Sequence, residues 1–152
     1  MSIAQRLKEL DITLPPAPAP AANYVPYVVE NGLVFVAGQV PLGDDGKLHY
    51  RGKVGLDISE EEGYQAARLC ALNGLAQLQA AVGSLDKVRR IVRVGGFVNC
   101  TDDFKNQPEV INGASDLLVE IFGDAGRHAR AAVGVNALPR GVATEVELVA
   151  AI

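Results

Sequence analysis

The chain has 152 residues, of which 49% are hydrophobic and 5% aromatic, and it carries a formal net charge of −4. This length predicts a single domain, and with no tryptophan the core must be built from Val, Leu, Ile and Ala. The acidic balance argues against a broad nucleic-acid-binding face, because such a face needs clustered positive charge.

The two cysteines, Cys70 and Cys100, form no CxxC pair, which favours free thiols over a disulfide framework. The N-terminal segment lacks the long apolar stretch of a signal peptide, and no window approaches a membrane span. His49 and His128 are not spaced with the cysteines as zinc ligands. No GxGxxG, P-loop or GxSxG motif is present. We therefore expect a cytoplasmic protein with no metal and no cofactor.

The first twenty residues are predicted to form a helix and an extended connector. Ser2 can cap a short helix that runs to Leu10, with one apolar face made by Ile3, Leu7 and Leu10. The proline-rich run at residues 15–20 is typical of extended backbone. Residues 1–20 are thus an N-terminal helix and Pro-rich extension, and residues 21–152 are the single main domain.

A β-hairpin is predicted next. Residues 27–30 and 33–37 have the composition of strands, and Asn31-Gly32 between them is the strongest short hairpin signal. Residues 48–51 are a candidate for a short third strand.

Two helices follow, separated by a strand. In the first, Ser59 and Glu62 form a capping box and Gly83 closes the helix; its apolar face is Tyr64, Ala67, Ala71, Leu75, Leu78 and Val82. In the second, Pro108 suits the first turn and Gly123 ends the helix; its apolar face is Val110, Ala114, Leu117, Leu118 and Ile121.

The strand between the helices spans residues 88–100. Strict alternation places Ile91 with Arg93 on one face, and Val92 with Val94 on the other. Gly95-Gly96 inside this strand predicts a bulge or the close approach of another backbone.

Residues 128–152 are predicted to form two strands around a type I turn at residues 138–141. In the first strand Ala131, Val133 and Val135 alternate with Arg130, Ala132 and Gly134. In the second, Thr144, Val146 and Leu148 alternate with Glu145 and Glu147. We expect the valine-rich face of both strands to pack on the helices.

The element order is therefore β-β-(β)-α-β-α-β-β. Each helix has one apolar stripe, so the simplest architecture is an α+β fold with a mixed sheet and both helices on one face. The other face of the sheet stays uncovered in a monomer, which predicts a homo-oligomer.

Arg130 is the candidate binding residue on chemical grounds. Its same-face neighbours, Ala132 and Gly134, are small and leave room for a carboxylate that the guanidinium holds in bidentate fashion. The alternative, which the residue chemistry alone favours, is an ordinary interface salt bridge to Glu145 or Glu147. On a simple hairpin Arg130 and Glu145 would lie roughly 13 Å apart along the strand, so a shared site would need another register or a neighbouring subunit.

Two motifs resemble the Rid family, also called YjgF or endoribonuclease L-PSP. Residues 130–147, with the pattern Arg-Ala-Ala-Val-Gly-Val-x2-Leu-Pro-x5-Glu-Val-Glu, resemble its closing signature, and Gly38-Gln39-x-Pro41 resembles its early strand end. The resemblance implies a chorismate-mutase-like α+β fold and a homotrimer with sites in the clefts between subunits. It also implies hydrolysis of reactive enamines and imines to 2-keto acids and ammonia.

The resemblance assigns roles to individual residues. Arg130 matches the arginine that grips the substrate carboxylate, and Glu145 matches the acid that orients or activates water. Tyr24 matches a tyrosine that closes the cleft. Gly38 matches a backbone contact to the ligand, and Asn112 matches a supporting polar residue.

Some positions depart from the family pattern. Ala132 stands where those members carry a cysteine whose backbone contacts the ligand, and Ala37 replaces the serine before Gly-Gln. These changes make the pocket more apolar, so the alternative to an imine deaminase is a non-catalytic binder of small carboxylates such as 2-keto acids. RNA cleavage or translation inhibition of the endoribonuclease L-PSP type is disfavoured by the acidic composition, and no nucleic-acid or membrane partner is expected.

Overall fold

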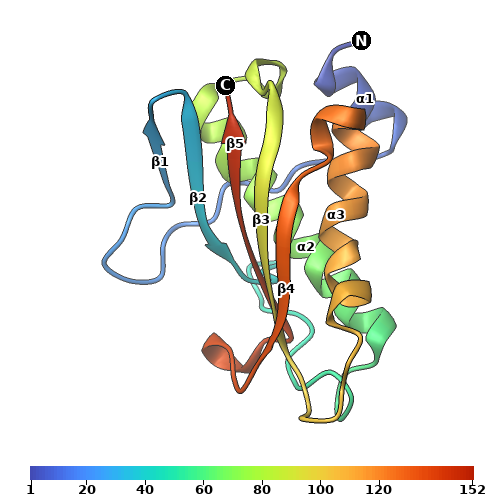
Figure 1. The fold of residues 1–152 in the computed structure, drawn as a ribbon. Coiled ribbons are helices and arrows are strands. Elements are labelled where there is room, and N and C mark those ends of the chain that lie inside the picture. Colours follow the sequence, from blue (N-terminus) through green and yellow to red (C-terminus); the bar gives the residue numbers. More distant parts are fainter.

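The computed structural model describes all 152 residues and contains one five-stranded sheet in the order β1-β2-β5-β3-β4 (Figure 1). The elements are α1 (Ile3–Glu9), β1 (Tyr27–Glu30), β2 (Leu33–Gln39), α2 (Glu60–Val82), β3 (Arg90–Asn99), α3 (Gln107–Phe122), β4 (Ala129–Val135) and β5 (Thr144–Ala151). Short 3₁₀ turns occur at Leu85–Lys87, Gly123–Gly126 and Pro139–Gly141.

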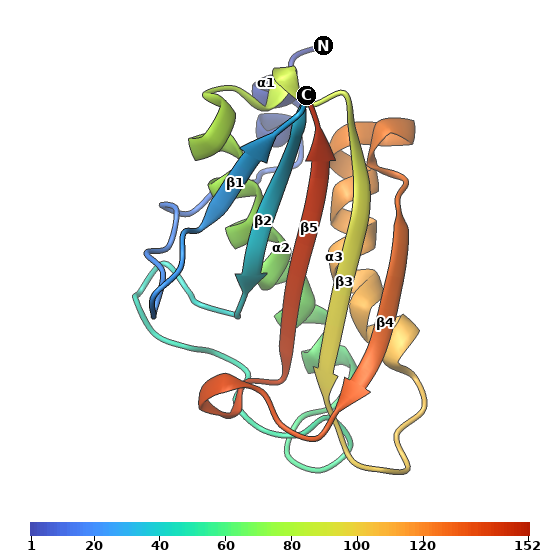
Figure 2. The same ribbon diagram turned by 60° about the vertical axis from the view of Figure 1, so that its left-hand side comes forward.

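The sheet is mixed, and the helices cover one face of it, as predicted. β1–β2, β2–β5 and β3–β5 pair antiparallel, whereas β3–β4 pairs parallel. Figure 2 shows the strands side by side with α2 and α3 behind them and the other face free. The predicted third strand is wrong, because residues 48–51 contribute only isolated bridges. Tyr50 and Gly52 have positive φ angles of 54° and 136°, which interrupt an extended backbone there.

The capping and turn motifs in the sequence predict the start of α2 and the β1–β2 turn correctly. Ser59 Oγ accepts from the Glu62 N–H at 3.1 Å, and the Glu62 carboxylate accepts from the Ser59 N–H at 3.0 Å, completing the predicted capping box of α2. Asn31 and Gly32 take positive φ angles of 51° and 75° in the β1–β2 hairpin, the conformation that a two-residue type I′ turn requires.

The last two strands do not form the predicted hairpin. β3 lies between β4 and β5, because α3 serves as the crossover that returns β4 parallel to β3. The turn at Leu138–Gly141 is also not type I, since Arg140 has a φ of 58°. A positive φ at this third position belongs to type II turns.

β4 therefore presents the opposite face to the one expected. Val133 is 43% exposed on the free face, whereas Ala132 packs against the core. The helix-facing side of β4 is the one with Arg130, Ala132 and Gly134. On β5 the expectation is confirmed: Thr144, Val146 and Leu148 are buried.

β3 carries its irregularity earlier than predicted. The register shift lies between Ile91 and Arg93, not at Gly95-Gly96. As a result Ile91 and Val94 are both buried while Arg93 is exposed, so strict alternation is wrong here. Gly96 does mark a close approach, but of a side chain: a Cβ on Gly96 would lie 2.6 Å from an atom of Ile111 in α3.

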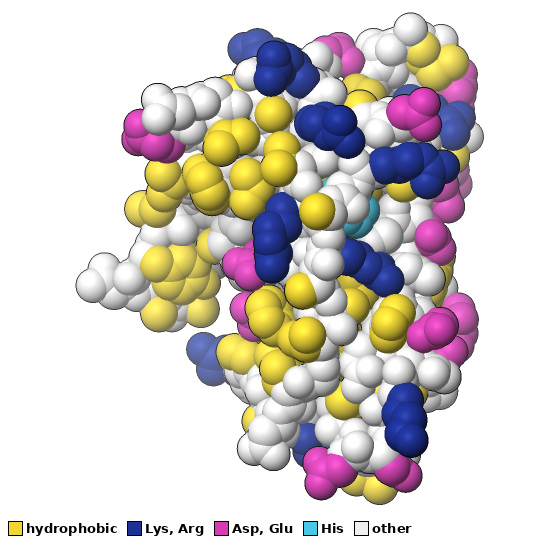
Figure 3. Space-filling view, viewed as in Figure 1, with side chains coloured by type: hydrophobic (Ala, Val, Ile, Leu, Met, Phe, Trp, Pro, Cys, Tyr) yellow, Lys and Arg dark blue, Asp and Glu magenta, His cyan; other side chains and the backbone are white.

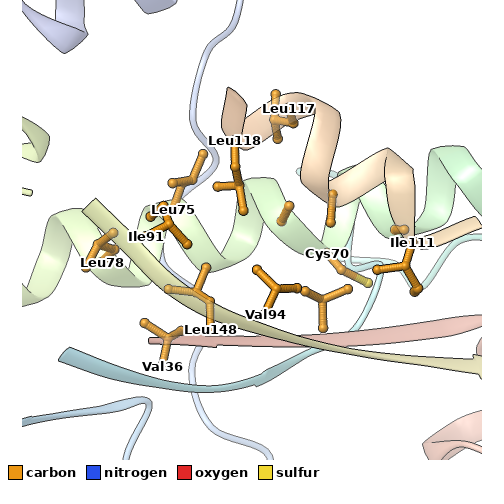
Figure 4. Close-up of a cluster of buried hydrophobic side chains, with 14 of the residues drawn as sticks. Val36, Cys70, Leu75, Leu78, Ile91, Val94, Ile111, Leu117, Leu118 and Leu148 are labelled. Carbon is orange, nitrogen blue, oxygen red and sulfur yellow. The ribbon is translucent and has the colours of Figure 1, made fainter. Parts of the chain in front are cut away.

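The core fills the space between the sheet and the two long helices. Leu75 of α2, Val94 of β3 and Ile111 of α3 are fully buried, and Figure 4 shows their side chains in one cluster. Burial of such aliphatic side chains is the main stabilising contribution to a fold of this kind. None of the helices combines the length and the apolar character that a membrane crossing requires.

The N-terminal extension packs against this body. Leu7 of α1 is buried, Arg6 Nε donates to the Glu120 carbonyl at 2.9 Å, and the Ile3 N–H donates to Asp86 at 2.7 Å. Further along, the Gln77 side-chain amide of α2 donates to the Pro18 carbonyl. This bond fixes the proline-rich segment beside the end of β2.

Gly113 lies at the point where α3 approaches the backbone of α2 closely enough to exclude a side chain. A Cβ on Gly113 would overlap the Tyr64 carbonyl oxygen of α2. We therefore expect Gly113→Ala to lower the free energy of unfolding by about 1–3 kcal/mol, although alanine is the better helix former. Urea unfolding measures the change.

Gly74→Ala is the matched control for this substitution. A Cβ on Gly74 would meet the end of the Leu148 side chain at 3.2 Å, and that side chain can move. The same substitution should therefore cost little or stabilise the protein. Equal losses at the two positions would contradict the role given to Gly113.

Candidate functional site

The main cleft of the protein lies around the end of β2. It has a volume of about 910 Å³. One wall is the proline-rich segment at residues 18–22, and the others are the end of β2, the loop that follows it, and the turn at Pro139–Gly141. Three of the predicted site residues, Tyr24, Gly38 and Glu145, line this cleft together.

Gly38 and Glu145 are in direct contact. Between Val36 and Gln39 the β2–β5 register shifts, which places a bulge at Ala37-Gly38, and bulges of this kind re-aim side chains beside functional sites. A Cβ on Gly38 would overlap the Glu145 carboxylate, so only glycine leaves the carboxylate its position. Burial, and secondarily the charge of Glu147, raises the pKa of the Glu145 carboxyl. Glu145 is therefore better suited to proton transfer than a solvated carboxylate.

Two further residues of the cleft were missed by the sequence analysis. Gln39 is 7% exposed and its side-chain amide donates to the Ala37 carbonyl at 2.9 Å, which braces the bulge. Arg140 is the cationic residue of the lining. Arg51 Nε donates to the Arg140 carbonyl at 3.0 Å. In the sequence Arg140 is one of the four residues of a predicted turn, and the signal for a site role is its positive charge five residues before the candidate acid Glu145.

Arg130 lies elsewhere, between β4 and α3. Its Nη1 donates to Ser115 Oγ at 3.1 Å and its Nη2 donates to the Pro108 carbonyl at 3.1 Å. Within one chain Arg130 forms no salt bridge to Glu145 or Glu147, so the predicted interface salt bridge would need a neighbouring subunit. Of the five N–H donors of a guanidinium these two bonds use two, so three remain for a ligand.

Asn112 and Ala132 belong to the same region. Pro108, Asn112 and Ser115 follow one another at helical spacings of four and three residues, so they lie on one face of α3. Arg130 contacts the first and last of these positions. Ala132 follows Arg130 on the same side of β4 and packs against the core.

The six predicted site residues therefore form two groups. Glu145 pairs with Phe97, which pairs with Val133, so these three lie on the free face of the sheet. Arg130 instead pairs with the buried Val94 on the helix-covered face. Within one chain, Arg130 and Glu145 are separated by a strand and by the sheet itself, so they cannot hold one small molecule together.

His128 and Ser115 were not predicted as site residues. His128 Nε2 lies 2.8 Å from Ser115 Oγ, and His128 Nδ1 lies 2.6 Å from the Gly126 carbonyl. Burial, and secondarily the charge of Arg130, lowers the pKa of His128, while the bond to Gly126 opposes this shift. The sequence could have indicated that His128 lies near Arg130, because it precedes Arg130 by two residues and so lies on the same side of the strand. No corresponding signal in the sequence points to Ser115.

The cysteines play a structural part. Cys70 and Cys100 are free, as expected, and both are buried. Cys70 Sγ lies 3.3 Å from Thr144 Oγ1, and burial raises the pKa of its thiol to about 12. Such a thiol is a poor nucleophile at neutral pH.

Comparison with known proteins supports the resemblance seen in the sequence. The family described as "YjgF/chorismate_mutase-like, putative endoribonuclease" matches residues 4–152. The protein TCP17 of Trypanosoma cruzi is 48% identical over 95% of this chain and 91% of that protein. The crystal structure of a candidate endoribonuclease from Shewanella oneidensis aligns with a TM-score of 0.96 at 38% identity and covers 100% of both chains.

A more distant neighbour carries a ligand. The Escherichia coli protein TdcF, crystallised with bound serine, aligns with a TM-score of 0.65 at 26% identity, over 90% of this chain and 93% of that one. These matches establish the chorismate-mutase-like α+β fold predicted from the sequence.

The contact between Gly38 and Glu145 can be tested with a double-mutant cycle. We expect Gly38→Ala to destabilise the wild-type protein by about 1 kcal/mol, the low end of the usual range for overpacking, because the new methyl group displaces the end of a side chain that can move. In a Glu145→Ala background the same change should cost much less, because the overlapping atoms are gone. Urea unfolding of the four proteins gives the coupling energy, and equal costs in both backgrounds would contradict the contact.

The lowered pKa of His128 predicts a pH dependence of stability. Between the folded pKa and the usual value of 6.5, the unfolded chain binds more protons than the folded one. The contribution of neutral His128 to the free energy of unfolding is therefore complete above pH 6.5. It is lost as the pH falls from 6.5 through the lowered pKa of the folded state. His128→Gln should remove this loss. Urea unfolding at about pH 7.5 and about pH 5 would show a smaller difference in the variant, and His49→Gln is the control for removal of a histidine.

Proposed function

Because the chain belongs to the YjgF/chorismate mutase-like family, we propose that it is an imine deaminase. In this proposal it hydrolyses reactive 2-imino acids to 2-keto acids and ammonia, in clefts between the subunits of a homotrimer. The observation that carries the proposal is the division of the site. One chain holds Arg130, with three unused N–H donors, on one side of its sheet and a cleft lined by Glu145 on the other.

Self-association is the simplest way to join the two groups. In a cyclic trimer, each interface brings one surface of a subunit against a different surface of the next subunit. Exposed apolar side chains on the free sheet face, among them Phe35 at 44% and Val133 at 43%, supply the kind of surface that such an interface covers. Figure 3 shows hydrophobic side chains gathered over β1 and β2, and Lys and Arg side chains over β3 and β4.

The chemistry follows from the two groups. The free N–H donors of Arg130 hold the substrate carboxylate in bidentate fashion. Glu145 of a neighbouring copy, with its raised pKa, accepts a proton from the attacking water and returns it to the departing nitrogen. Asn112 supports the arginine, while Gly38 and Ala132 offer backbone groups and Tyr24 closes the cleft. Imines hydrolyse readily in water, so positioning and charge stabilisation suffice.

The ligand of a relative supports the substrate class. TdcF was crystallised with serine, a small molecule with the carboxylate and the nitrogen-bearing carbon that a 2-imino acid also has. The alternative function is binding of small carboxylates without turnover. The alanines at positions 37 and 132 favour it, because they replace the serine and cysteine of the family pattern. RNA cleavage, suggested by the names of some relatives, is disfavoured by the net charge of −4.

An imine-hydrolysis assay tests the proposal. An amino-acid oxidase generates 2-iminopropionate or 2-iminobutyrate, and semicarbazide traps the imine that remains. We expect the protein to accelerate imine loss and Arg130→Ala to reduce that acceleration by about 10²–10³-fold. Arg89→Ala is the control, because that exposed arginine lies outside both residue groups. Keto-acid binding without acceleration would instead favour the carboxylate binder.

Mixing two inactive variants tests whether the proposed active site is divided between two subunits. Arg130→Ala and Glu145→Ala chains should regain activity when they are unfolded and refolded together, because about a quarter of the clefts then combine intact residues from two copies. Light scattering should give about three times the chain mass of 16.0 kDa. A monomer, or no recovery from chains that refold, would contradict the intersubunit site.

A further inference from the structure

Ser115, His128 and the Gly126 carbonyl form a chain of hydrogen bonds beside Arg130. The Ser115 hydroxyl lies 2.8 Å from His128 Nε2, and His128 Nδ1 lies 2.6 Å from the Gly126 oxygen. The imine hydrolysis proposed above does not use His128, and Ser115 enters it only through its bond to Arg130. Their arrangement has the three parts of an activated nucleophile: a hydroxyl, a base, and a group that orients the base.

The bond to Gly126 determines which nitrogen of His128 carries the proton. A carbonyl oxygen can only accept a hydrogen bond, so Nδ1 must be the donor in a neutral imidazole. Nε2 then holds a lone pair and accepts the proton of the Ser115 hydroxyl. In active serine hydrolases the third member of the triad fixes the same tautomer, and here a backbone carbonyl does so.

Arg130 adds a positive charge at the same oxygen. Its Nη1 donates to Ser115 Oγ at 3.1 Å, so negative charge that develops on or next to this oxygen is stabilised. Ser115, His128 and Arg130 are all partly exposed. On the same side of the strand, Ala132 packs against the core and Gly134 lies beside Cys100 and Gln107, so an acyl group must approach from the exposed edge between β4 and α3.

We propose that Ser115 is a nucleophile activated by His128, and that the edge of the sheet between β4 and α3 is an acyl-transfer site for esters of short carboxylic acids. Arg130 stabilises the oxyanion of the tetrahedral intermediate. This site is a second activity, and it does not rest on imine hydrolysis.

The steps balance without any further reactant except water. Ser115 Oγ forms a bond to the ester carbonyl carbon while its proton passes to His128 Nε2. The carbon–oxygen bond to the leaving alcohol then breaks, and His128 returns the proton to that oxygen. Water attacks the acyl-serine in the same way, giving the free acid and restoring the serine hydroxyl.

The experiment is covalent labelling of the full-length protein with diisopropyl fluorophosphate. Intact mass and peptide mapping should find one adduct per chain, on Ser115, and the labelled protein should no longer hydrolyse p-nitrophenyl acetate. Ser59 and Ser84 are internal controls, because their hydroxyls accept hydrogen bonds from backbone N–H groups and are not bonded to a histidine. No adduct on Ser115 would overturn the proposal.

Two further measurements separate activation from simple exposure. His128→Gln keeps a hydrogen-bonding side chain but removes the base, so labelling should slow by about 100-fold or more. In the wild-type protein the labelling rate should rise with pH and reach a plateau as His128 loses its proton. An unchanged rate in a folded His128→Gln protein, or a rate independent of pH, would overturn the proposal. Both readouts are independent of imine hydrolysis.

Discussion

The packing of α2 and α3 on only one face of the sheet is the constraint on which the rest of this structure depends. It divides every strand into a buried side and a free side, and successive residues alternate between them except at the bulges in β2 and β3. Arg130 falls on the helix side, where Ser115 and Pro108 orient its guanidinium. Glu145 falls on the free side, where the bulge in β2 makes room for it. The separation of the two groups therefore follows from the architecture.

Signals confined to a few residues were sufficient for most of the elements. The capping box at Ser59 and the Asn31-Gly32 turn each specify backbone geometry through their own hydrogen bonds or φ angles. Strand order is different, because it depends on pairings between distant segments. Residues 129–151 contain two strands and a turn, yet nothing within them indicates that β3 inserts between the strands. The error about which face of β4 is buried has the same origin, since Ala131 and Val133 look apolar enough to be core.

The site was predictable to the extent that it rests on residue type. Arg130 could be singled out from its small neighbours, and Gly38 and Glu145 from the family resemblance. The cleft itself could not be predicted, since its wall at residues 18–22 is held by a bond from Gln77 in the middle of α2. Ser115 and His128 come from different elements and meet only because α3 packs behind β4. Such convergence is a property of tertiary packing, and no sequence spacing encodes it.

Arg130 links the two proposed activities and also sets them against each other. A guanidinium has five donors, and Ser115 and Pro108 occupy two of them. A carboxylate bound in bidentate fashion takes two more, which leaves one for an acyl oxyanion. Since a bound carboxylate also neutralises the charge that an oxyanion needs, one guanidinium serves one anion at a time. A 2-keto acid formed by the first proposed activity is therefore a competitor for the second, and the two reactions are coupled through a single residue.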